Sequence, residues 1–234
     1  MKVTQVSENL WQLTRLGAFN CYLVREVDGL TLVDTGMSGS ANSILATAVS
    51  LNQPITRITL THAHGDHAGS FDAVAAQLQD ADIVLNARTV QFLVGDLTLL
   101  STEPQDKLRG SFVTCTTPAT RQLQSGDCLG SLRVVAAPGH TPDQIAFFDE
   151  RDGSLIAGDA FQTAGGTAVA GQMRWLFPFP AMATWHKETA LQTAYTLRDL
   201  NPTRLAVGHG RVLKNPQTAI EKAIREAEKS MKVR

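Results

Sequence analysis

The segment THAHGDHAG concentrates four side chains that can bind a metal ion: His62, His64, Asp66 and His67. A regular strand or helix does not aim all four at one point, because its side chains project in fixed directions. A tight turn, aided by positive φ at Gly65, can aim them at two adjacent points. His62 and His64 then suit one ion, and Asp66 and His67 suit a second. The pattern H-x-H-x-D-H therefore predicts a metal centre.

Three more candidate ligands follow predicted strands later in the chain, namely His140, Asp159 and His209. Each lies next to a glycine, so the backbone can approach a metal ion closely. An isolated residue of this kind often makes only a hydrogen bond, but the three together with the first cluster indicate ligands. Imidazole and carboxylate groups without thiolates suit zinc, and also iron, manganese or cobalt.

Hydrophobic patterning predicts alternating strands and helices around these residues. Strands are expected within 1–35 and at 55–60, 83–85, 132–136, 145–148, 155–157 and 204–207. Helices are expected at 40–51, 70–78 and 87–94, from an N-cap at Thr184 to about Leu200, and after Asn215-Pro216. The stretch 95–120 is expected to be loop with a helical fragment. The two halves look alike, which indicates a sandwich of sheets covered by helices in a single domain spanning 1–234.

The composition describes a globular chain without strong charge. Its 234 residues are 43% hydrophobic and 18% charged, with a net charge of −1, which supports a sizeable core and opposes a basic nucleic-acid surface. No apolar run reaches the roughly 18 residues of a membrane helix, the start lacks a signal-peptide core, and three separated cysteines make no disulfide framework. We therefore expect a soluble, cytoplasmic protein with a small-molecule substrate, and with neither nucleic acid nor a membrane as partner.

The order of the candidate ligands resembles that of the metallo-β-lactamase-fold hydrolases. The family pattern has an aspartate on an early strand, the H-x-H-x-D-H motif, a later histidine, a bridging aspartate and a final histidine. The matching positions are Asp34, His62, His64, Asp66, His67, His140, Asp159 and His209. The resemblance covers nearly the whole chain. It implies an α/β (α+β) fold, a four-layer αββα sandwich with the metals at one edge.

The resemblance also implies how two metal ions are held. The first ion would lie among His62, His64 and His140. The second would lie among Asp66, His67 and His209, with Asp159 bridging the two. Two zinc ions are expected, with iron or manganese as alternatives.

Such a centre is suited to hydrolysis. A divalent ion lowers the pKa of a bound water toward about 7 and polarises a carbonyl oxygen. A hydroxide bridging the two ions would then attack a small ester-, lactone-, lactam- or thioester-like substrate. Asp66 is the expected catalytic residue, because it can orient the hydroxide or pass a proton to the leaving group. Asp34 and Thr61 are expected to hold the imidazoles by hydrogen bonds, with turn formation as the alternative role.

Residues 160–183 carry a single charge, Arg174. The segment also holds four large aromatic side chains: Phe161, Trp175, Phe177 and Phe179. Its place between the bridging aspartate and the next helix favours a mobile apolar flap over the metals. Packing in the core or in a homodimer interface is the competing interpretation. A flap would favour a substrate with an apolar portion, and Arg174 could anchor a carboxylate.

Residues outside the ligand set separate this chain from several branches of the family. Acyl-homoserine lactonases carry a tyrosine three residues after the bridging aspartate, where this chain has Gln162. One class of β-lactamases uses a cysteine ligand, and no cysteine occupies a ligand position here. Glyoxalase-II-type thioesterases usually carry an extra helical C-terminal region and ribonuclease-Z-like enzymes a basic arm. Flavodiiron proteins carry a glutamate where this chain has His64.

Two other classes of function stay open. An iron-dependent sulfur dioxygenase of related fold uses one metal ion, and a non-enzymatic member would only bind metal. The complete second ligand set of Asp66, His67 and His209 favours the hydrolase. The remaining histidine, His186, stands at a predicted helix start, which favours a surface or helix-end residue over a substrate contact.

Overall fold

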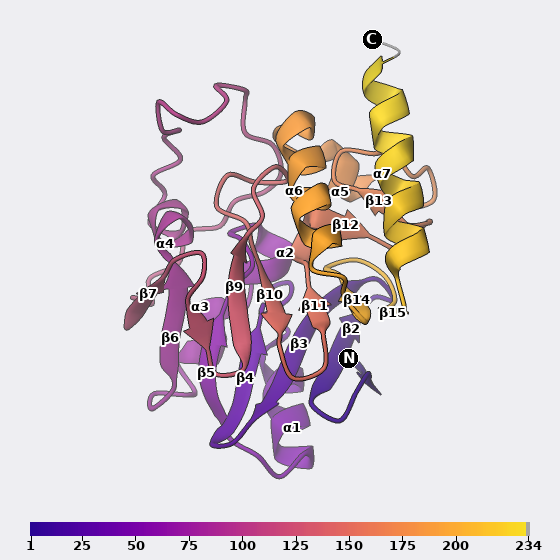
Figure 1. Ribbon diagram of the computed structural model, residues 1–234. Coiled ribbons are helices and arrows are strands. Elements are labelled where there is room, and N and C mark those ends of the chain that lie inside the picture. The colour runs from indigo at the N-terminus through magenta and orange to yellow at the C-terminus, as the bar shows by residue number, and fades with distance from the viewer. Residues whose placement is uncertain (233–234) are drawn as a thin grey trace.

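Two β-sheets lie face to face between layers of helices in the computed structural model, which describes residues 1–232 (Figure 1). The first sheet contains, in spatial order, β1 (Lys2–Gln5), β2 (Leu10–Arg15), β3 (Phe19–Glu26), β4 (Gly29–Val33), β5 (Ile55–Thr59), β6 (Asp82–Asn86) and β7 (Arg121–Leu123). The second contains β15 (Leu213–Lys214), β14 (Arg204–Ala206), β11 (Ser154–Ile156), β10 (Ile145–Asp149), β9 (Leu132–Ala136) and β8 (Cys128–Leu129). A separate two-stranded sheet pairs β12 (Phe161–Gln162) with β13 (Ala168–Val169).

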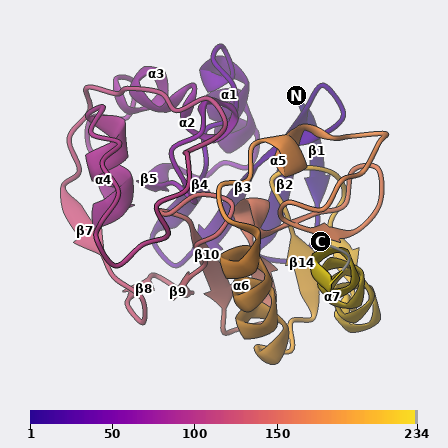
Figure 2. The same cartoon turned by 90° about the horizontal axis from the view of Figure 1, so that it is seen from above.

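Helices α1 (Ala41–Ser50) and α3 (Phe71–Ala75) of the first half lie on one side of the sheets, and α6 (Lys187–Asp199) and α7 (Gln217–Lys232) of the second half lie on the other (Figure 2). The first half also supplies α2 (Gly65–Ala68) and α4 (Ala87–Leu93). The second half also supplies a 3₁₀ helix (Gly158–Ala160) and α5 (Phe179–Met182). Across residues 1–232, no helix is both long and apolar enough to cross a membrane.

Three apolar clusters hold these layers together. One packs Leu32 of the first sheet with Ile44 of α1, and a second packs Tyr22 with Phe147 between the sheets. The third places Ile224 of α7 in the core outside the second sheet. Burial of apolar surface on both sides of each sheet therefore produces the predicted αββα sandwich, which is confirmed.

The last helix shows why the chain packs in this way. Ile220, Ala223, Ile224 and Ala227 of α7 are buried, and their spacing places them on one face of a helix. Charged residues occupy the other face, where Glu221 and Arg225 form an i,i+4 pair. The helix is therefore stable only when its apolar stripe covers the second half of the molecule.

The loops that carry the candidate ligands leave the sandwich at one edge. Strand β4 runs parallel to β5, and β11 runs parallel to β14. Because the carboxyl ends of parallel strands meet at the same edge, the residues that follow them converge. Asp34 follows β4, His62 follows β5, Asp159 follows β11 and His209 follows β14.

The structure differs from the sequence prediction in three respects. Residues 95–120 contain no helix, so the predicted helical fragment is wrong. Strands β7, β8, β12, β13 and β15 were not predicted, because they are only two or three residues long and lack the run of apolar residues that marks β11 and β14. Helix α6 is capped by His186, whose ring accepts a hydrogen bond from the Thr189 backbone N–H, and not by Thr184. A helix-end position for His186 is thus confirmed.

Candidate metal centre

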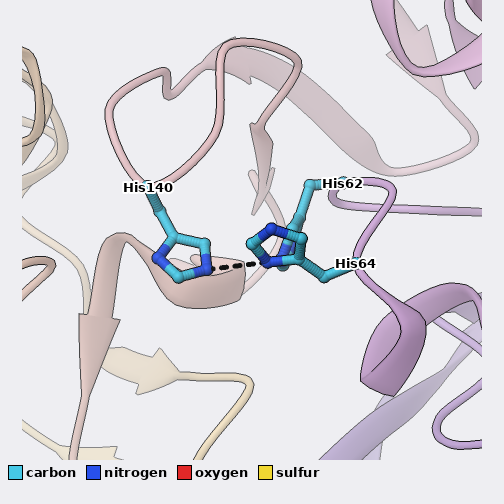
Figure 3. A group of neighbouring side chains, drawn as sticks. All are labelled: His62, His64 and His140. Carbon is cyan, nitrogen blue, oxygen red and sulfur yellow. Dashed lines mark hydrogen bonds between the residues drawn. The ribbon is translucent and has the colours of Figure 1, made fainter. Parts of the chain in front are cut away.

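Three histidines from two loops face one point (Figure 3). His62 and His64 follow β5, and His140 lies between β9 and β10. Nδ1 of His64 lies 3.2 Å from Nε2 of His62 and 3.1 Å from Nε2 of His140. Zinc bound tetrahedrally to nitrogens at about 2.0–2.1 Å would separate those nitrogens by about 3.3–3.4 Å. The spacing of these residues, the first triad, therefore fits one divalent ion.

Asp66, His67 and His209 form a second group with converging ligand atoms, the second triad. Oδ2 of Asp66 lies 3.2 Å from Nε2 of His209 and 3.9 Å from Nε2 of His67. The second triad joins the loop after β5 to the loop after β14. It therefore depends on both halves of the molecule.

Asp159 lies between the two triads. Its Oδ2 is 3.3 Å from Nε2 of His140 and 3.0 Å from Nε2 of His209, and its Oδ1 is 3.3 Å from Nε2 of His67. Oδ1 of Asp159 and Nε2 of His67 are buried and make no hydrogen bond. A cation would satisfy both atoms, so the residues present fit the metal ions that the sequence predicts. All of the predicted ligand side chains thus come together at one edge of the sandwich.

The turn that directs the H-x-H-x-D-H side chains to two points is formed differently from the prediction. Gly65 does not have positive φ but begins the one-turn helix α2. The change of direction occurs at His64, the N-cap, which is extended at φ −69° and ψ 148°. Gly65 is needed for space instead, because a Cβ there would lie 2.9 Å from Cγ1 of Val113. Asp66 and His67 lie in α2, and this helical turn points both side chains toward His209, the third member of the second triad.

Hydrogen bonds at the outer ring nitrogens set the tautomers of His62 and His67. Nδ1 of His67 donates to Oδ2 of Asp34 over 2.7 Å. Oγ1 of Thr61 donates to the same carboxylate over 2.9 Å, and so accepts from Nδ1 of His62 at 3.0 Å. Both outer nitrogens therefore carry a proton, so each ring would bind an ion through Nε2, which in His67 must first lose its own proton. These are the contacts expected of Asp34 and Thr61.

Two acceptors that the sequence did not reveal act in the same way on His64 and His140. Nε2 of His64 donates to the carbonyl of Arg109 over 2.9 Å, which leaves Nδ1 free for an ion. Nδ1 of His140 lies 3.1 Å from Oγ1 of Thr184, which itself donates to the carbonyl of Pro180, so the imidazole is the donor. A backbone carbonyl carries no side-chain signal, and Thr184 resembled a helix cap.

Asp143 is a further residue that the motifs missed. Its side chain is fully buried, and its Oδ2 accepts from the Ala63 backbone N–H at 3.0 Å and from Oγ1 of Thr89 at 2.9 Å. Ala63 stands between His62 and His64, so Asp143 holds the peptide that joins two ligands of the first triad. Burial raises the pKa of Asp143 to about 6. Its position shortly after His140 was the only signal for it.

Two glycines leave room for the ligands. A Cβ at Gly208 would lie 2.1 Å from Oδ1 of Asp159, and one at Gly110 would lie 2.3 Å from Nε2 of His64. Gly110 also has φ +88°, a conformation that other residues rarely adopt. The glycine beside His209 thus lets the backbone pack directly against the side chains of two candidate ligands, Asp159 and His67.

The imidazoles of the first triad are neutral. Burial lowers the pKa of His140 to about 3, and it holds the pKa of His62 well below its usual value. Burial also lowers the pKa of His64. A neutral imidazole has a free lone pair, so this triad is ready to bind a cation near neutral pH.

The second triad has the opposite electrostatic character. Burial disfavours the charged form of His209, but Asp159 and Asp66 outweigh it and raise its pKa to about 9. Burial likewise opposes charge on His67, yet Asp34 and Asp159 hold its pKa well above the usual value. Without an ion, protons on these histidines therefore balance the carboxylates. A bound cation would replace them.

A cavity of about 380 Å³ opens onto both triads. Besides candidate ligands, it is lined by Gly110, Ser111, Phe179, Pro180, Met182 and Ala183. Asp66 is the most accessible ligand carboxylate, with 29% of its side chain exposed against 3% for Asp159. A substrate in the cavity would therefore meet Asp66 before it meets Asp159.

The segment predicted as a flap contains residues in different environments. Phe161 is fully buried in the core with residues of α6 and α7, which corrects its assignment to a flap. Arg174 pairs with Glu226 of α7 and donates to the carbonyl of Thr167, so it is not an anchor directed at the cavity.

The other three aromatic residues of that segment differ in their distance from the centre. Phe177 packs against His209, with ring centroids 5.2 Å apart, and Phe179 lines the cavity. Trp175 is exposed and does not line the cavity. Of the four aromatic residues of the predicted segment, Phe177 and Phe179 therefore adjoin the candidate centre.

Comparison with known proteins agrees with this geometry. The sequence profile of the metallo-beta-lactamase superfamily matches residues 15–209, which include every candidate ligand. The chain belongs to the metallo-beta-lactamase superfamily. Two proteins of Bacillus subtilis (strain 168) are similar to this superfamily member. The uncharacterized protein YobT is 44% identical, over 98% of this chain and 100% of its own length, and the probable metallo-hydrolase YflN is 28% identical, over 82% and 80%.

Solved structures show the same fold at low sequence identity. A crystal structure of the DIM-1 metallo-beta-lactamase superposes with a TM-score of 0.71 at 15% identity, covering 98% of this chain and 97% of that one. The mono-zinc form of the metallo-beta-lactamase FIM-1 from Pseudomonas aeruginosa gives a TM-score of 0.70 at 19% identity, covering 98% and 95%. These likenesses support the architecture of this superfamily member and not a particular substrate.

We expect Asp143→Ala to weaken zinc binding by about 10- to 100-fold, because the peptide between His62 and His64 loses its buried acceptor. Asp143→Asn keeps an oxygen for Ala63 and should retain most of the affinity. Competition with a chromophoric chelator measures both variants, with circular dichroism as the control for folding. Equal affinities for Asp143→Ala and the unchanged protein would show that the carboxylate does not position the ligands.

Metal uptake by the superfamily member should release protons at pH 7. The raised pKa values of His209 and His67 mean that both are protonated without metal, and an ion can bind only after those protons leave. Affinity at the second triad should therefore rise with pH up to about 9, by about tenfold per pH unit for each proton released. Calorimetric titration in buffers of different ionisation enthalpy counts the protons. Heats that do not depend on the buffer would contradict the protonated state.

Proposed function

We propose that this chain is a dinuclear metal-dependent hydrolase that acts on a small ester-, lactone-, lactam- or thioester-like substrate. The observation that carries the proposal is the position of Asp159, whose carboxylate contacts histidines of both triads. A bridging carboxylate between two complete ligand sets is the arrangement that two-metal hydrolysis requires. The name of the relative YflN, a probable metallo-hydrolase, supports the same class.

In this proposal, the first triad would hold one ion and the second triad the other, and the Asp159 carboxylate lies within reach of both triads. The donors are imidazole nitrogens and carboxylate oxygens, a set that favours zinc and also suits iron or manganese. Of the cysteines, all within the described residues, none belongs to a candidate metal group. The ligand set therefore favours two zinc ions.

Bound at these triads, divalent ions would lower the pKa of a water molecule and polarise the acyl oxygen of a substrate. The chain itself supplies proton transfer and exclusion of water. Asp66 is the more exposed of the two ligand carboxylates that line the cavity, so it is placed to carry a proton to the leaving group. Phe179 and Met182 form an apolar part of the cavity wall, which a bound substrate would cover and so shield from water.

The hydrolase is tested by metal analysis combined with a panel of one lactone, one lactam, one thioester and one aryl ester. Two zinc ions per chain and turnover of at least one substrate are expected, with loss of turnover on chelation and recovery on addition of zinc. One iron per chain with oxygen uptake would instead indicate a sulfur-dioxygenase-like oxidoreductase. Full metal content with no turnover across the panel would favour a member that only binds metal.

The role of Asp66 is tested by Asp66→Asn. We expect kcat/KM to fall by about 10²-fold or more, because the amide cannot carry the proton and binds an ion weakly. Asp80→Asn, on an exposed turn away from the centre, is the matched control and should behave as the unchanged protein. Full zinc content and full turnover in Asp66→Asn would show that the assignment of Asp66 is wrong.

A further inference from the structure

The cavity over the two triads continues into an unusually apolar surface segment, residues 173–182. Phe179 and Met182 line the cavity, yet 60% and 61% of their surface is exposed to solvent. Side chains of this size cost free energy when water surrounds them, and a monomer seldom gathers them beside a cleft without a ligand to cover them. The cavity wall is therefore suited to an apolar ligand.

The polar groups of this region are turned away from the cavity or already bonded. Arg174, the charged residue of the segment, pairs with Glu226 on α7. Gln162 is buried, and its amide donates to the carbonyls of Ala164 and Phe177. Among the described residues that line the cavity, there is no lysine or arginine. The described cavity lining therefore offers a substrate carboxylate no lysine or arginine side chain.

A neighbouring hollow limits how far an apolar ligand can extend. It shares Met182 with the cavity, and it is lined by charged side chains that include Asp106, Arg109 and Glu188. Met182 therefore stands at the boundary between an apolar wall and a charged surface. Its flexible thioether side chain can adapt to ligands of different length.

We propose that the substrate of this centre is an uncharged acyl compound with an unbranched aliphatic chain that lies on Phe179 and Met182. This inference rests on the hydrolase proposed above. The scissile carbonyl then faces the two triads, while the chain runs along α5 toward Met182. Water attacks the carbonyl carbon, the bond to the leaving heteroatom breaks, and the leaving group takes up the proton carried by Asp66. The products are a fatty acid and an alcohol, or a thiol from a thioester.

The proposal is tested with p-nitrophenyl esters from acetate to decanoate and the zinc-loaded protein. We expect kcat/KM to rise by about two- to fourfold per methylene, as burial of a CH₂ group predicts, and to level off once the chain passes Met182. A short ester such as the butanoate should exceed its analogue with a terminal carboxylate by at least about tenfold, because no lysine or arginine of the described chain lines the cavity before the charged hollow beyond Met182. A flat dependence on chain length, or equal rates for the charged analogue, would overturn the proposal.

Variants locate the binding surface. Phe179→Ala and Met182→Ala should each reduce the increase per methylene, whereas Trp175→Ala should keep it. Trp175 is the matched control, because it is an exposed aromatic residue of the same segment that does not line the cavity. The same slope in all three variants would contradict binding on this wall. Dissociation of a dimer by Phe179→Ala, without a change in slope, would instead assign the wall to an interface between two copies and overturn the proposal.

A binding measurement separates this inference from the hydrolase itself. Alkyl hydroxamates of increasing length, titrated by calorimetry into the zinc-loaded protein, should bind more tightly with each methylene in the unchanged protein and in Trp175→Ala. If no ester is hydrolysed but this dependence holds, the hydrolase fails and the apolar wall stands. If esters are hydrolysed but neither rates nor affinities depend on chain length, the hydrolase stands and the apolar wall fails.

Discussion

The hydrogen bonds at the outer ring nitrogens of four buried histidines are the interactions on which the rest of this site depends. An imidazole binds a metal ion only through a nitrogen that carries no proton, and the partner of the other nitrogen decides which one that is. Asp34, Thr61, Thr184 and the carbonyl of Arg109 keep four protons on the outside of the cluster. Because these acceptors are fixed in the fold, four rings are oriented before any ion binds.

The strand order of the sandwich brings these acceptors and ligands to one edge. The parallel pairs β4–β5 and β11–β14 direct four of the loops, and contacts between the two halves also fix the loop that follows β14. Asn20 donates from β3 to the carbonyls of Val207 and Gly210, and Tyr22 also donates to Val207. The loop that carries His209 is therefore held by the first sheet. The second triad thus depends on the packing of the two sheets against each other.

Much of this arrangement could be predicted from the sequence because it resides in side-chain types at fixed spacing. The H-x-H-x-D-H motif and the strand-end residues identified the atoms that converge, and hydrophobic periodicity identified the long strands and helices that carry them. Residues that act through the backbone or through distant contacts left no such pattern. The carbonyl of Arg109 has no side-chain signature, and Asp143 reaches Ala63 across eighty positions of the chain. Phe161 looked like part of a surface segment because burial beside α6 and α7 is a tertiary property.

Anomalous X-ray diffraction at the zinc edge, from crystals of the zinc-loaded protein, tests the central claim most directly. The account predicts two peaks about 3.5–4 Å apart, with one inside the first triad, the other inside the second, and Asp159 between them. The outer ring nitrogens should keep their present hydrogen bonds to Asp34 and Thr184. A single peak, or peaks away from the two triads, would contradict a dinuclear centre in this fold.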